Sequence, residues 1–476
     1  MKKISAICLI LCLILLMQPV QVYSAQGNGL SCGGLDASAA LAGQEKMLET
    51  ADAALVYDRS SGTMIYGYNA DARIYPTSMV KLMTAIVALE NGNLEDMVVV
   101  SRAALDSVAI GSVSAGLVRW EEISLRDLLY CMMVASANDA SAVIAMHVGG
   151  SIDQFITMMN EKARQLGCQD TNFSNVHGLH DENTYTTARD ICKILNYGLE
   201  NELFRAMFET KAYTVPATNK NEERNIITTN YLMSKGYTSK YYDKYFDSRV
   251  TGGKTGGTDA AGRCVAVTAK VNNMDLIAIV MGADPYYTDD GLSVTRFGSF
   301  EEMTELLDFV EKGYEVGQIF YANQVIDRYS VSGGDSDVAV SPVDSMYCVV
   351  PKELKFEELT WYVGSGTNSI TAPVQKGQVI TQLSVWYQGI CIGNTDLVAM
   401  HDVKVYEPYI EPDIHSPLEQ EDNHGNLIAT IALGVLGLVV LGFVIMVLRR
   451  LVHVAVVKAR IRRRKKARRR PYARME

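Results

Sequence analysis

The sequence lacks the paired cysteines and clustered histidines that would indicate a disulfide framework or a metal centre. None of its nine cysteines forms a Cys-x-x-Cys pair, and the seven that follow the N-terminal apolar block are odd in number and dispersed. Most of them are therefore expected to be small buried hydrophobic residues. Among seven histidines the one close pair is His177 with His180, and no His-Glu-x-x-His motif is present. A zinc enzyme is disfavoured, and no metal or other cofactor is predicted.

Positive charge is scarce in the body of the chain. Of its 44 basic residues, 13 lie in residues 449–476 and two more are the lysines at positions 2 and 3. The stretch between these ends carries 29 basic and 53 acidic residues, a net charge of −24. A body this acidic is not expected to bind nucleic acid.

Both ends of the chain carry targeting patterns. Residues 4–17 are apolar behind two lysines and are followed by small residues, which predicts a secretory signal peptide over residues 1–25. Residues 427–448 contain no charge and would extend about 33 Å as a helix, which predicts a transmembrane helix. The basic tail 449–476 is expected in the cytoplasm, against anionic membrane lipids. These patterns together predict a single-pass protein of the cell membrane with its body outside.

The first of two predicted domains covers residues 45–316. Residues 53–69 have the pattern of a β-hairpin, and residues 264–284 read as two strands joined at Asn272-Asn273. Helical periodicity is found at residues 78–90, 124–134, 151–167 and 299–313. The last two helices are expected to open with Ser-x-x-Gln and Ser-x-x-Glu capping boxes and to close at glycine. This order predicts an α+β domain, with helices packed on an antiparallel sheet.

From residue 317 onward the helical periodicity stops. Apolar segments alternate with Gly and Pro breaks, which predicts a small all-β domain over residues 317–406. Residues 407–426 contain three prolines and six acidic residues. They are expected to form an extended stalk that leads to the membrane span.

A Ser-x-x-Lys motif, Ser78 with Lys81 in "RIYPTSMVKLMTA", stands at the predicted start of the 78–90 helix. A plain helix cap is the simpler interpretation of one such motif, because it arises by composition about twice in a chain of this length. The spacing nevertheless puts both side chains on one face of the helix, where the lysine can reach the hydroxyl. A lysine can take the serine proton only where burial or a second cation lowers its pKa.

Two later motifs supply the missing parts. Lys254 in "VTGGKTGGTDAAG" is a second cation on a predicted strand, whose glycines leave the strand edge open to another backbone. The segment "VASANDASAV" places Ser136 and Asn138 between two predicted helices. The order Ser-x-x-Lys, Ser-x-Asn, Lys-Thr-Gly is a signature of serine β-lactamases and penicillin-binding proteins.

With these motifs the chain resembles the low-molecular-mass penicillin-binding proteins that act as D-alanyl-D-alanine carboxypeptidases, the peptidase S11 family. The segment "NFSNVHGL" also matches, and the resemblance covers residues 45–406. It implies a serine β-lactamase/transpeptidase-like fold, removal of the terminal D-alanine from peptidoglycan pentapeptide stems, and inhibition by β-lactam antibiotics. Two departures are Ala137, where many members have glycine, and the predicted membrane span, where many members use an amphipathic helix.

The resemblance implies catalytic roles for four residues. Ser78 would be the acylated nucleophile and Lys81 its general base. Ser136 and Asn138 would relay protons and hold the substrate amide.

It also implies a substrate-binding role for the strand from Lys254 to Gly257. Lys254 would set the positive field and Thr255 would bind the terminal carboxylate, with Gly256 and Gly257 following. The backbone amides of Ser78 and Gly257 would form an oxyanion hole.

Two alternatives to a carboxypeptidase stay open at this point. A class A β-lactamase would need a separate deacylation carboxylate, and no Glu-x-x-Leu-Asn motif is present. A catalytically idle penicillin-binding receptor or cell-wall scaffold would not need the three motifs intact. D-Ala release from a pentapeptide stem would separate these alternatives from the enzyme.

Overall fold

A computed structural model describes Leu35, residues 40–287, 294–364 and 370–408, Leu441 and residues 444–446. The predicted signal peptide and basic tail lie outside the described residues, as do nearly all of the predicted stalk and span. No helix within the described part is both long and apolar enough to cross a bilayer.

The N-terminal domain is built on a five-stranded antiparallel sheet, as predicted. Its strands run in the order β2 (Thr63–Tyr68), β1 (Ala53–Asp58), β9 (Met274–Ala283), β8 (Gly262–Val271) and β7 (Val250–Thr258). The predicted hairpin turn between β8 and β9 is confirmed, because Asn272 and Asn273 have φ angles of 46° and 66°, as a tight two-residue turn requires. The order leaves β7 at one edge of the sheet.

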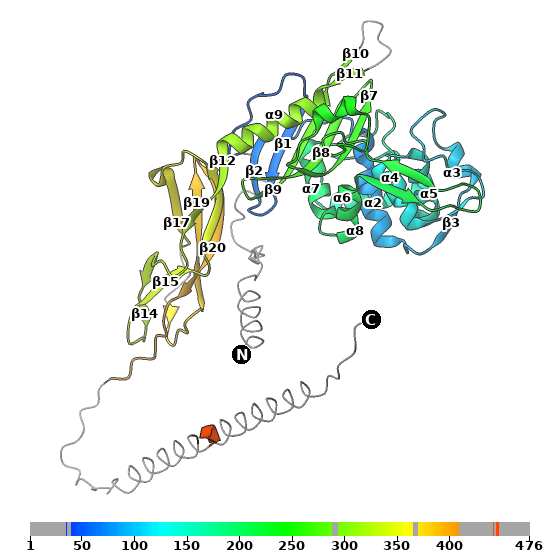
Figure 1. Cartoon of the computed structure of the whole chain (residues 1–476). Coiled ribbons are helices and arrows are strands. Elements are labelled where there is room, and N and C mark those ends of the chain that lie inside the picture. Colours follow the sequence, from blue (N-terminus) through cyan, green and yellow to red (C-terminus); the bar gives the residue numbers. More distant parts are fainter. Residues whose placement is uncertain are drawn as a thin grey trace, which may run out of the picture. The chain divides into compact units, whose positions relative to one another are not determined.

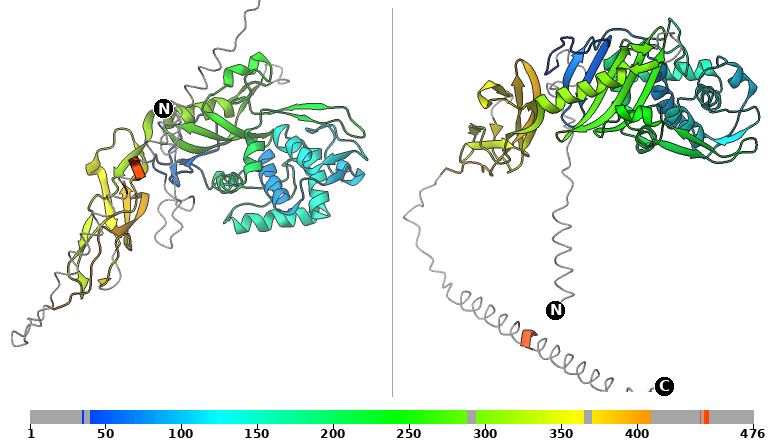
Figure 2. Two further views of the ribbon diagram at one scale, coloured as in Figure 1. Left: turned by 60° about the horizontal axis from the view of Figure 1, so that its bottom comes forward. Right: turned by 45° about the horizontal axis from the view of Figure 1, so that its top comes forward.

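Helices cover both faces of this sheet (Figures 1 and 2). The helix α9 (Gly298–Gly313) lies on one face, against β8 and β9. The larger group stands on the other side: α2 (Val80–Asn91), α3 (Arg102–Asp106), α4 (Leu125–Val134), α5 (Asn138–Gly149), α6 (Ile152–Gln165), α7 (Ala188–Gly198) and α8 (Glu202–Glu209). The alternation along β9 explains the two layers, since Ile277 and Ile279 join the core under the large helical group while Ala278 and Val280 join the core under α9.

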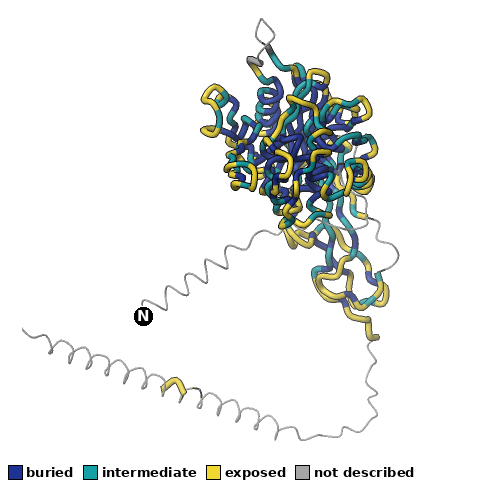
Figure 3. The backbone as a smooth tube through the Cα atoms, turned by 90° about the vertical axis from the view of Figure 1, so that its right-hand side faces the viewer, coloured by how far each residue is buried: buried dark blue, intermediate teal, exposed yellow. Residues whose placement is uncertain are grey.

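Three short strand pairs complete the described part of the N-terminal domain. Two-stranded antiparallel sheets pair β3 (Met97–Val99) with β4 (Glu122–Ser124), between which α3 lies in the sequence, β5 (Ala212–Val215) with β6 (Arg224–Ile227), and β10 (Pro285–Tyr287) with β11 (Val294–Phe297). Burial is concentrated in the interior of the domain, and exposed residues mark its loops (Figure 3). Five cysteines, Cys131, Cys168, Cys192, Cys264 and Cys348, are free and buried, as the sequence predicted for most of them.

The residues that follow α9 form the predicted all-β domain. Strand β12 (Tyr314–Phe320) starts directly after the helix and pairs with β16 (Met346–Pro351). The main sheet runs β13 (Asp327–Tyr329), β15 (Val338–Pro342), β20 (Ile390–Ala399), β19 (Val379–Tyr387), β17 (Leu359–Val363), and β14 (Val331–Ser332) pairs with β18 (Ile370–Thr371). The strand β19 alternates buried and half-buried or exposed residues, as expected for a strand with one face on a core.

One of the two predicted capping boxes is wrong. The hydroxyl of Ser151 caps α6 as expected and accepts from the amide of Gln154. Ser299, however, lies inside α9, which begins one residue earlier and has no side-chain cap. The amide of Phe297 instead donates to the hydroxyl of Tyr245, so a tertiary contact rather than a local cap fixes this helix start.

Glu302, the residue expected to complete that capping box, binds the N-terminal part of the chain instead. Its buried carboxylate accepts from the amide and the hydroxyl of Thr50, both at 2.7 Å, and from the amide of Ala51 at 3.0 Å. These bonds fasten the segment that leads into β1 to helix α9.

The Glu302→Ala variant should lower the free energy of unfolding by about 1–3 kcal/mol, because it leaves these donors without a partner. Glu305→Ala is the matched control, since Glu305 is exposed on the same helix and its loss should change stability by less than about 0.5 kcal/mol. Denaturant unfolding of both variants measures the difference. Equal stabilities would mean that water replaces Glu302.

Candidate active site

Ser78 lies at the start of helix α2, as predicted. A single 3-10 turn, η1 (Thr77–Met79), leads into the helix, and Thr77 has a φ angle of 49° that few side-chain-bearing residues adopt. Ser78 is half-buried and Lys81, one turn later, is fully buried. The Lys81 Nζ atom lies 3.0 Å from Ser78 Oγ.

Lys81 has two further partners, and both are acceptors. Its Nζ donates to Asn138 Oδ1 at 2.7 Å and to the carbonyl oxygen of His177 at 2.5 Å. A neutral amine has two N–H groups and one lone pair, so these two acceptors leave the lone pair for the Ser78 proton. After the proton moves, the ammonium can donate to all three neighbours without changing position.

The surroundings of Lys81 favour its neutral form. Burial lowers the pKa of Lys81 well below its ordinary value, and the charge of Lys254 lowers it further, while Asp139 opposes the shift. Both terms disfavour the ammonium in a site shielded from water. Sequence analysis asked for burial or a second cation beside this lysine, and the structure has both.

The Ser-x-Asn motif forms the junction between α4 and α5. Ser136 has a φ angle of 60° and its hydroxyl accepts from Lys254 Nζ at 2.8 Å. Asn138 opens α5, and its side chain holds Lys81. The junction thus contacts both lysines of the site, Lys254 through Ser136 and Lys81 through Asn138.

The Lys-Thr-Gly motif lies on β7, the edge strand. Lys254 is buried, and burial lowers its pKa to about 7. The hydroxyl of Thr255 lies 2.5 Å from that of Thr229. A Cβ atom on Gly256 would come within 2.0 Å of Thr77 Oγ1 and 2.8 Å of the Ser78 amide nitrogen. Only a glycine lets β7 run this close to the nucleophile.

Residues 175–178 also belong to the site, although none of the three sequence motifs assigned them a role. The His177 carbonyl binds Lys81, and a Cβ atom on Gly178 would come within 1.8 Å of the Thr77 carbonyl oxygen. Asn175 Oδ1 fixes the turn by accepting from the amide of Gly178 at 2.7 Å. The match to "NFSNVHGL" indicated this segment, but a backbone carbonyl acceptor leaves no side-chain signal.

Asp139, a buried carboxylate next to the Ser-x-Asn motif, binds the loop formed by residues 113–117. Asp139 accepts from Ser114 Oγ at 2.6 Å and from two backbone amides of residues 113–117. The amide of Asn138 donates to the Val113 carbonyl at 2.8 Å. The loop 113–117 therefore fixes the residue that holds Lys81.

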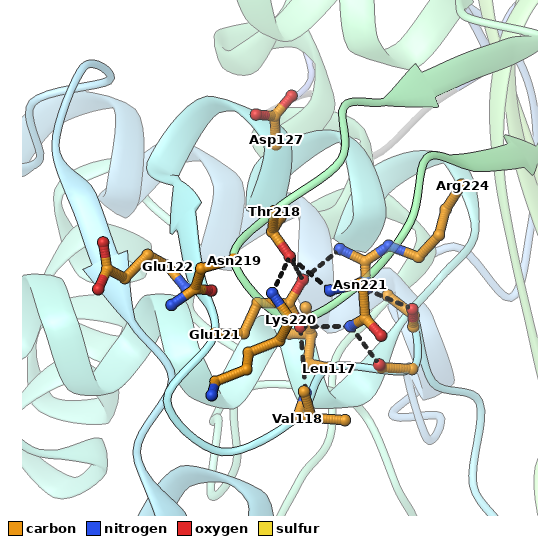
Figure 4. Close-up of polar contacts among 12 residues, drawn as sticks. Leu117, Val118, Glu121, Glu122, Asp127, Thr218, Asn219, Lys220, Asn221 and Arg224 are labelled. Carbon is orange, nitrogen blue, oxygen red and sulfur yellow. Dashed lines mark hydrogen bonds and ion pairs between the residues drawn. The ribbon is translucent and has the colours of Figure 1, made fainter.

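A second buried carboxylate, Glu121, binds side chains that in turn hold the loop 113–117 (Figure 4). It accepts from Arg224 at 2.6 Å, Asn221 at 2.7 Å and Thr218 at 3.0 Å, which belong to β6 and the loop before it. Arg224 and Asn221 also donate to backbone carbonyls of residues 115 and 116. No sequence pattern indicated this network, because Glu121 lies about 100 residues from its partners.

The pattern of a family described as D-alanyl-D-alanine carboxypeptidase, peptidase S11, matches residues 40–285. The chain belongs to the peptidase S11 family. A second pattern, that of the C-terminal domain of penicillin-binding protein 5, matches residues 314–405.

Curated relatives of this S11 peptidase extend over most of both chains. The D-alanyl-D-alanine carboxypeptidase DacA of Haemophilus influenzae is 31% identical over 361 residues, which is 74% of this chain and 85% of the relative. DacF of Bacillus subtilis is 28% identical over 75% of this chain and 87% of its own length. The solved structure of penicillin-binding protein 5 from Haemophilus influenzae is similar with a TM-score of 0.59 and 28% identity, covering 76% of this chain and all of that one.

The two histidines that could have suggested a metal serve other contacts. The His177 ring accepts from the amide of Leu179, and burial, followed by the charge of Lys81, lowers the pKa of His177 to about 4. His180 packs edge-on against Tyr75. Across the described part of the chain, no three or more metal-ligating side chains are grouped.

The Gly178→Ala variant should reduce acylation of Ser78 about 100-fold or more, because the new methyl group displaces the Thr77 backbone that carries the nucleophile. Gly150→Ala is the matched control. Gly150 also has a positive φ, 73°, but open space around it. The rate of labelling by a fluorescent penicillin measures both, and a normal rate in Gly178→Ala would exclude this close contact.

Proposed function

We propose that this S11 peptidase removes the terminal D-alanine from peptidoglycan pentapeptide stems through an acyl-enzyme on Ser78. The observation that carries the proposal is the contact of Ser78 with a buried lysine whose other two partners are acceptors. An idle receptor would have no need of a lysine that burial keeps ready to accept a proton.

In the proposed acylation, Ser78 Oγ attacks the carbonyl carbon of the penultimate D-alanine while its proton moves to Lys81. The oxyanion that forms would accept from the backbone amides of Ser78 and Gly257, fixed donors that need no rearrangement. The C–N bond then breaks, and the proton held by Lys81 passes to the leaving amine with Ser136, which Lys254 contacts, as the relay. Lys81 is then neutral again. Water hydrolyses the ester in a second step.

β-Lactam antibiotics are expected to follow the first half of this route. Their strained amide presents a carbonyl to Ser78 as the D-Ala-D-Ala bond does. The ester that forms keeps the rest of the drug attached, so that no small leaving group clears the site.

Intact mass after incubation with penicillin should show one adduct, which digestion maps to the peptide containing Ser78. Lys81→Ala should abolish both this adduct and D-Ala release from a pentapeptide stem, because the serine then has no base. Lys270→Ala is the control, since Lys270 forms an exposed ion pair on β8. An adduct elsewhere would reject Ser78, and labelling of all three proteins without D-Ala release would favour the receptor.

We propose further that the enzyme is a single-pass protein of the cell membrane. The support is in the sequence: an N-terminal signal pattern, the charge-free run 427–448 and the 13 basic residues after it. This topology puts the catalytic domain on the side where peptidoglycan lies and the basic tail against anionic lipid in the cytoplasm.

Protease added to intact protoplasts should degrade the catalytic domain and spare an epitope placed after Glu476. Permeabilised protoplasts are the control in which the epitope should also be lost. Loss of the epitope from intact cells would show that the tail is not cytoplasmic.

A further inference from the structure

Trp120, in the turn between Val118 and Glu121, has a backbone conformation that suits glycine better than tryptophan. Its φ angle is 66°, in the left-handed region that a bulky side chain adopts only under constraint. Burial does not offset this cost, because 55% of the residue is exposed. Neither the turn nor the core therefore requires a tryptophan here. An exposed side chain held on strained backbone indicates that the ring itself has a function.

Backbone and side-chain contacts hold Trp120 in this conformation. Its amide donates to the Val100 carbonyl at 2.9 Å, and its own carbonyl accepts from the side chain of Asn219 at 3.0 Å. The amide of Glu121 closes the turn by donating to the Val118 carbonyl at 3.1 Å. Because these partners come from separate parts of the chain, the indole stands on a fixed base.

The indole has charged hydrogen-bonding groups around it. The Arg119 guanidinium lies over the ring, 4.6 Å from its centroid. Asn219 also accepts from the amide of Glu122, which brings Lys220 to the same turn. The side chains of Glu122 and Lys220 are exposed and extend away from the hydrogen-bonded network in Figure 4. An aromatic face with a polar rim suits a sugar, whose ring has an apolar C–H face and hydroxyl groups at its edge.

The loop that carries Trp120 is continuous with the catalytic machinery. It includes Val113, whose carbonyl accepts from the amide of Asn138, and Asn138 in turn holds Lys81. The side chains of Val113 and Val118 are exposed along with the indole. A substrate that extends beyond the catalytic residues on this side therefore meets the loop.

We propose that Trp120 binds the sugar backbone of peptidoglycan, the glycan strand whose stem peptide occupies the catalytic site. This assignment rests on the proposed carboxypeptidase function, because it takes the stem as the substrate. Each stem branches from a sugar of the strand, so a stem in the site brings its strand to the surrounding loops. The Trp120 loop offers an aromatic ring for one face of such a sugar. The substrate class is then a stem attached to glycan rather than a free peptide.

The test compares Trp120→Gly with the wild type, as full-length proteins, on two substrates that carry the same pentapeptide stem. One is the free peptide, and the other is an uncross-linked glycan strand that bears the stem. Glycine adopts a φ angle of 66° without strain, so the variant keeps the course of the loop and loses only the ring. The kcat/KM for D-Ala release from the strand should fall about 2- to 12-fold through a higher KM, as expected for one aromatic contact, while the free peptide reacts at the wild-type rate.

Two further variants are the controls. Trp120→Tyr keeps an aromatic ring and should retain most of the wild-type rate on the strand. Trp361→Ala removes an exposed tryptophan of the β domain and should behave as the wild type on both substrates. An equal loss on strand and free peptide in Trp120→Gly would overturn the proposal, because the ring would then act on the catalytic residues. No loss on either substrate would also overturn it, and is expected if the ring docks a protein or a lipid surface.

A second readout does not depend on turnover. The chain contains three tryptophans, so intrinsic fluorescence reports on Trp120. Glycan strands from which the stems have been removed should shift the emission of the wild type and of Ser78→Ala, but not that of Trp120→Gly. No shift in the wild type would overturn the proposal. Absence of D-Ala release from both substrates in the wild type would instead reject the proposed function, whatever the fluorescence shows.

Discussion

The site depends on one buried amine. Lys81 contacts the nucleophile, a side-chain carbonyl from the α4–α5 junction and a backbone carbonyl from the segment before α7. An amine with no water around it would be costly to bury unless its hydrogen-bonding capacity were filled. The three elements that meet at Lys81 therefore have to be placed together by the fold, and each is fixed by contacts of its own.

Those contacts require unusual backbone conformations, or positions that only glycine can occupy, at several points around Ser78. Thr77 and Ser136 adopt positive φ angles although they carry side chains, and Gly178 is packed onto the backbone of Thr77. Such conformations persist only where the surroundings over-determine them, and they gather at functional sites. Here the surroundings are the sheet edge, the turn held by Asn175 and the loop held by Asp139 and Glu121. The contacts that hold these conformations keep the nucleophile and its base in position, so that neither has to rearrange before reaction.

The sequence predicted the parts of this arrangement that depend on local pattern. The β-hairpins, the antiparallel sheet, the helix start at Ser78 and the meeting of the three motifs are all found in the structure. The capping box at Ser299 is wrong because a distant hydroxyl, that of Tyr245, sets the start of α9. The His177 carbonyl and the Glu121 network could not be predicted, because a backbone acceptor has no residue preference and the members of the network are brought together only by the tertiary fold.

The alternation of a β-strand explains how the edge strand β7 can meet different neighbours on its two faces. Burial lowers the pKa of Lys254 to about 7, so that its charge responds to its neighbours and it suits proton transfer through Ser136. Gly256 lets the Thr77–Ser78 backbone approach β7, and Gly257 lets the side chain of Arg263 from β8 approach it. A side chain larger than hydrogen at position 256 or 257 would displace one of these two neighbours, which explains the two glycines that follow Thr255 in β7.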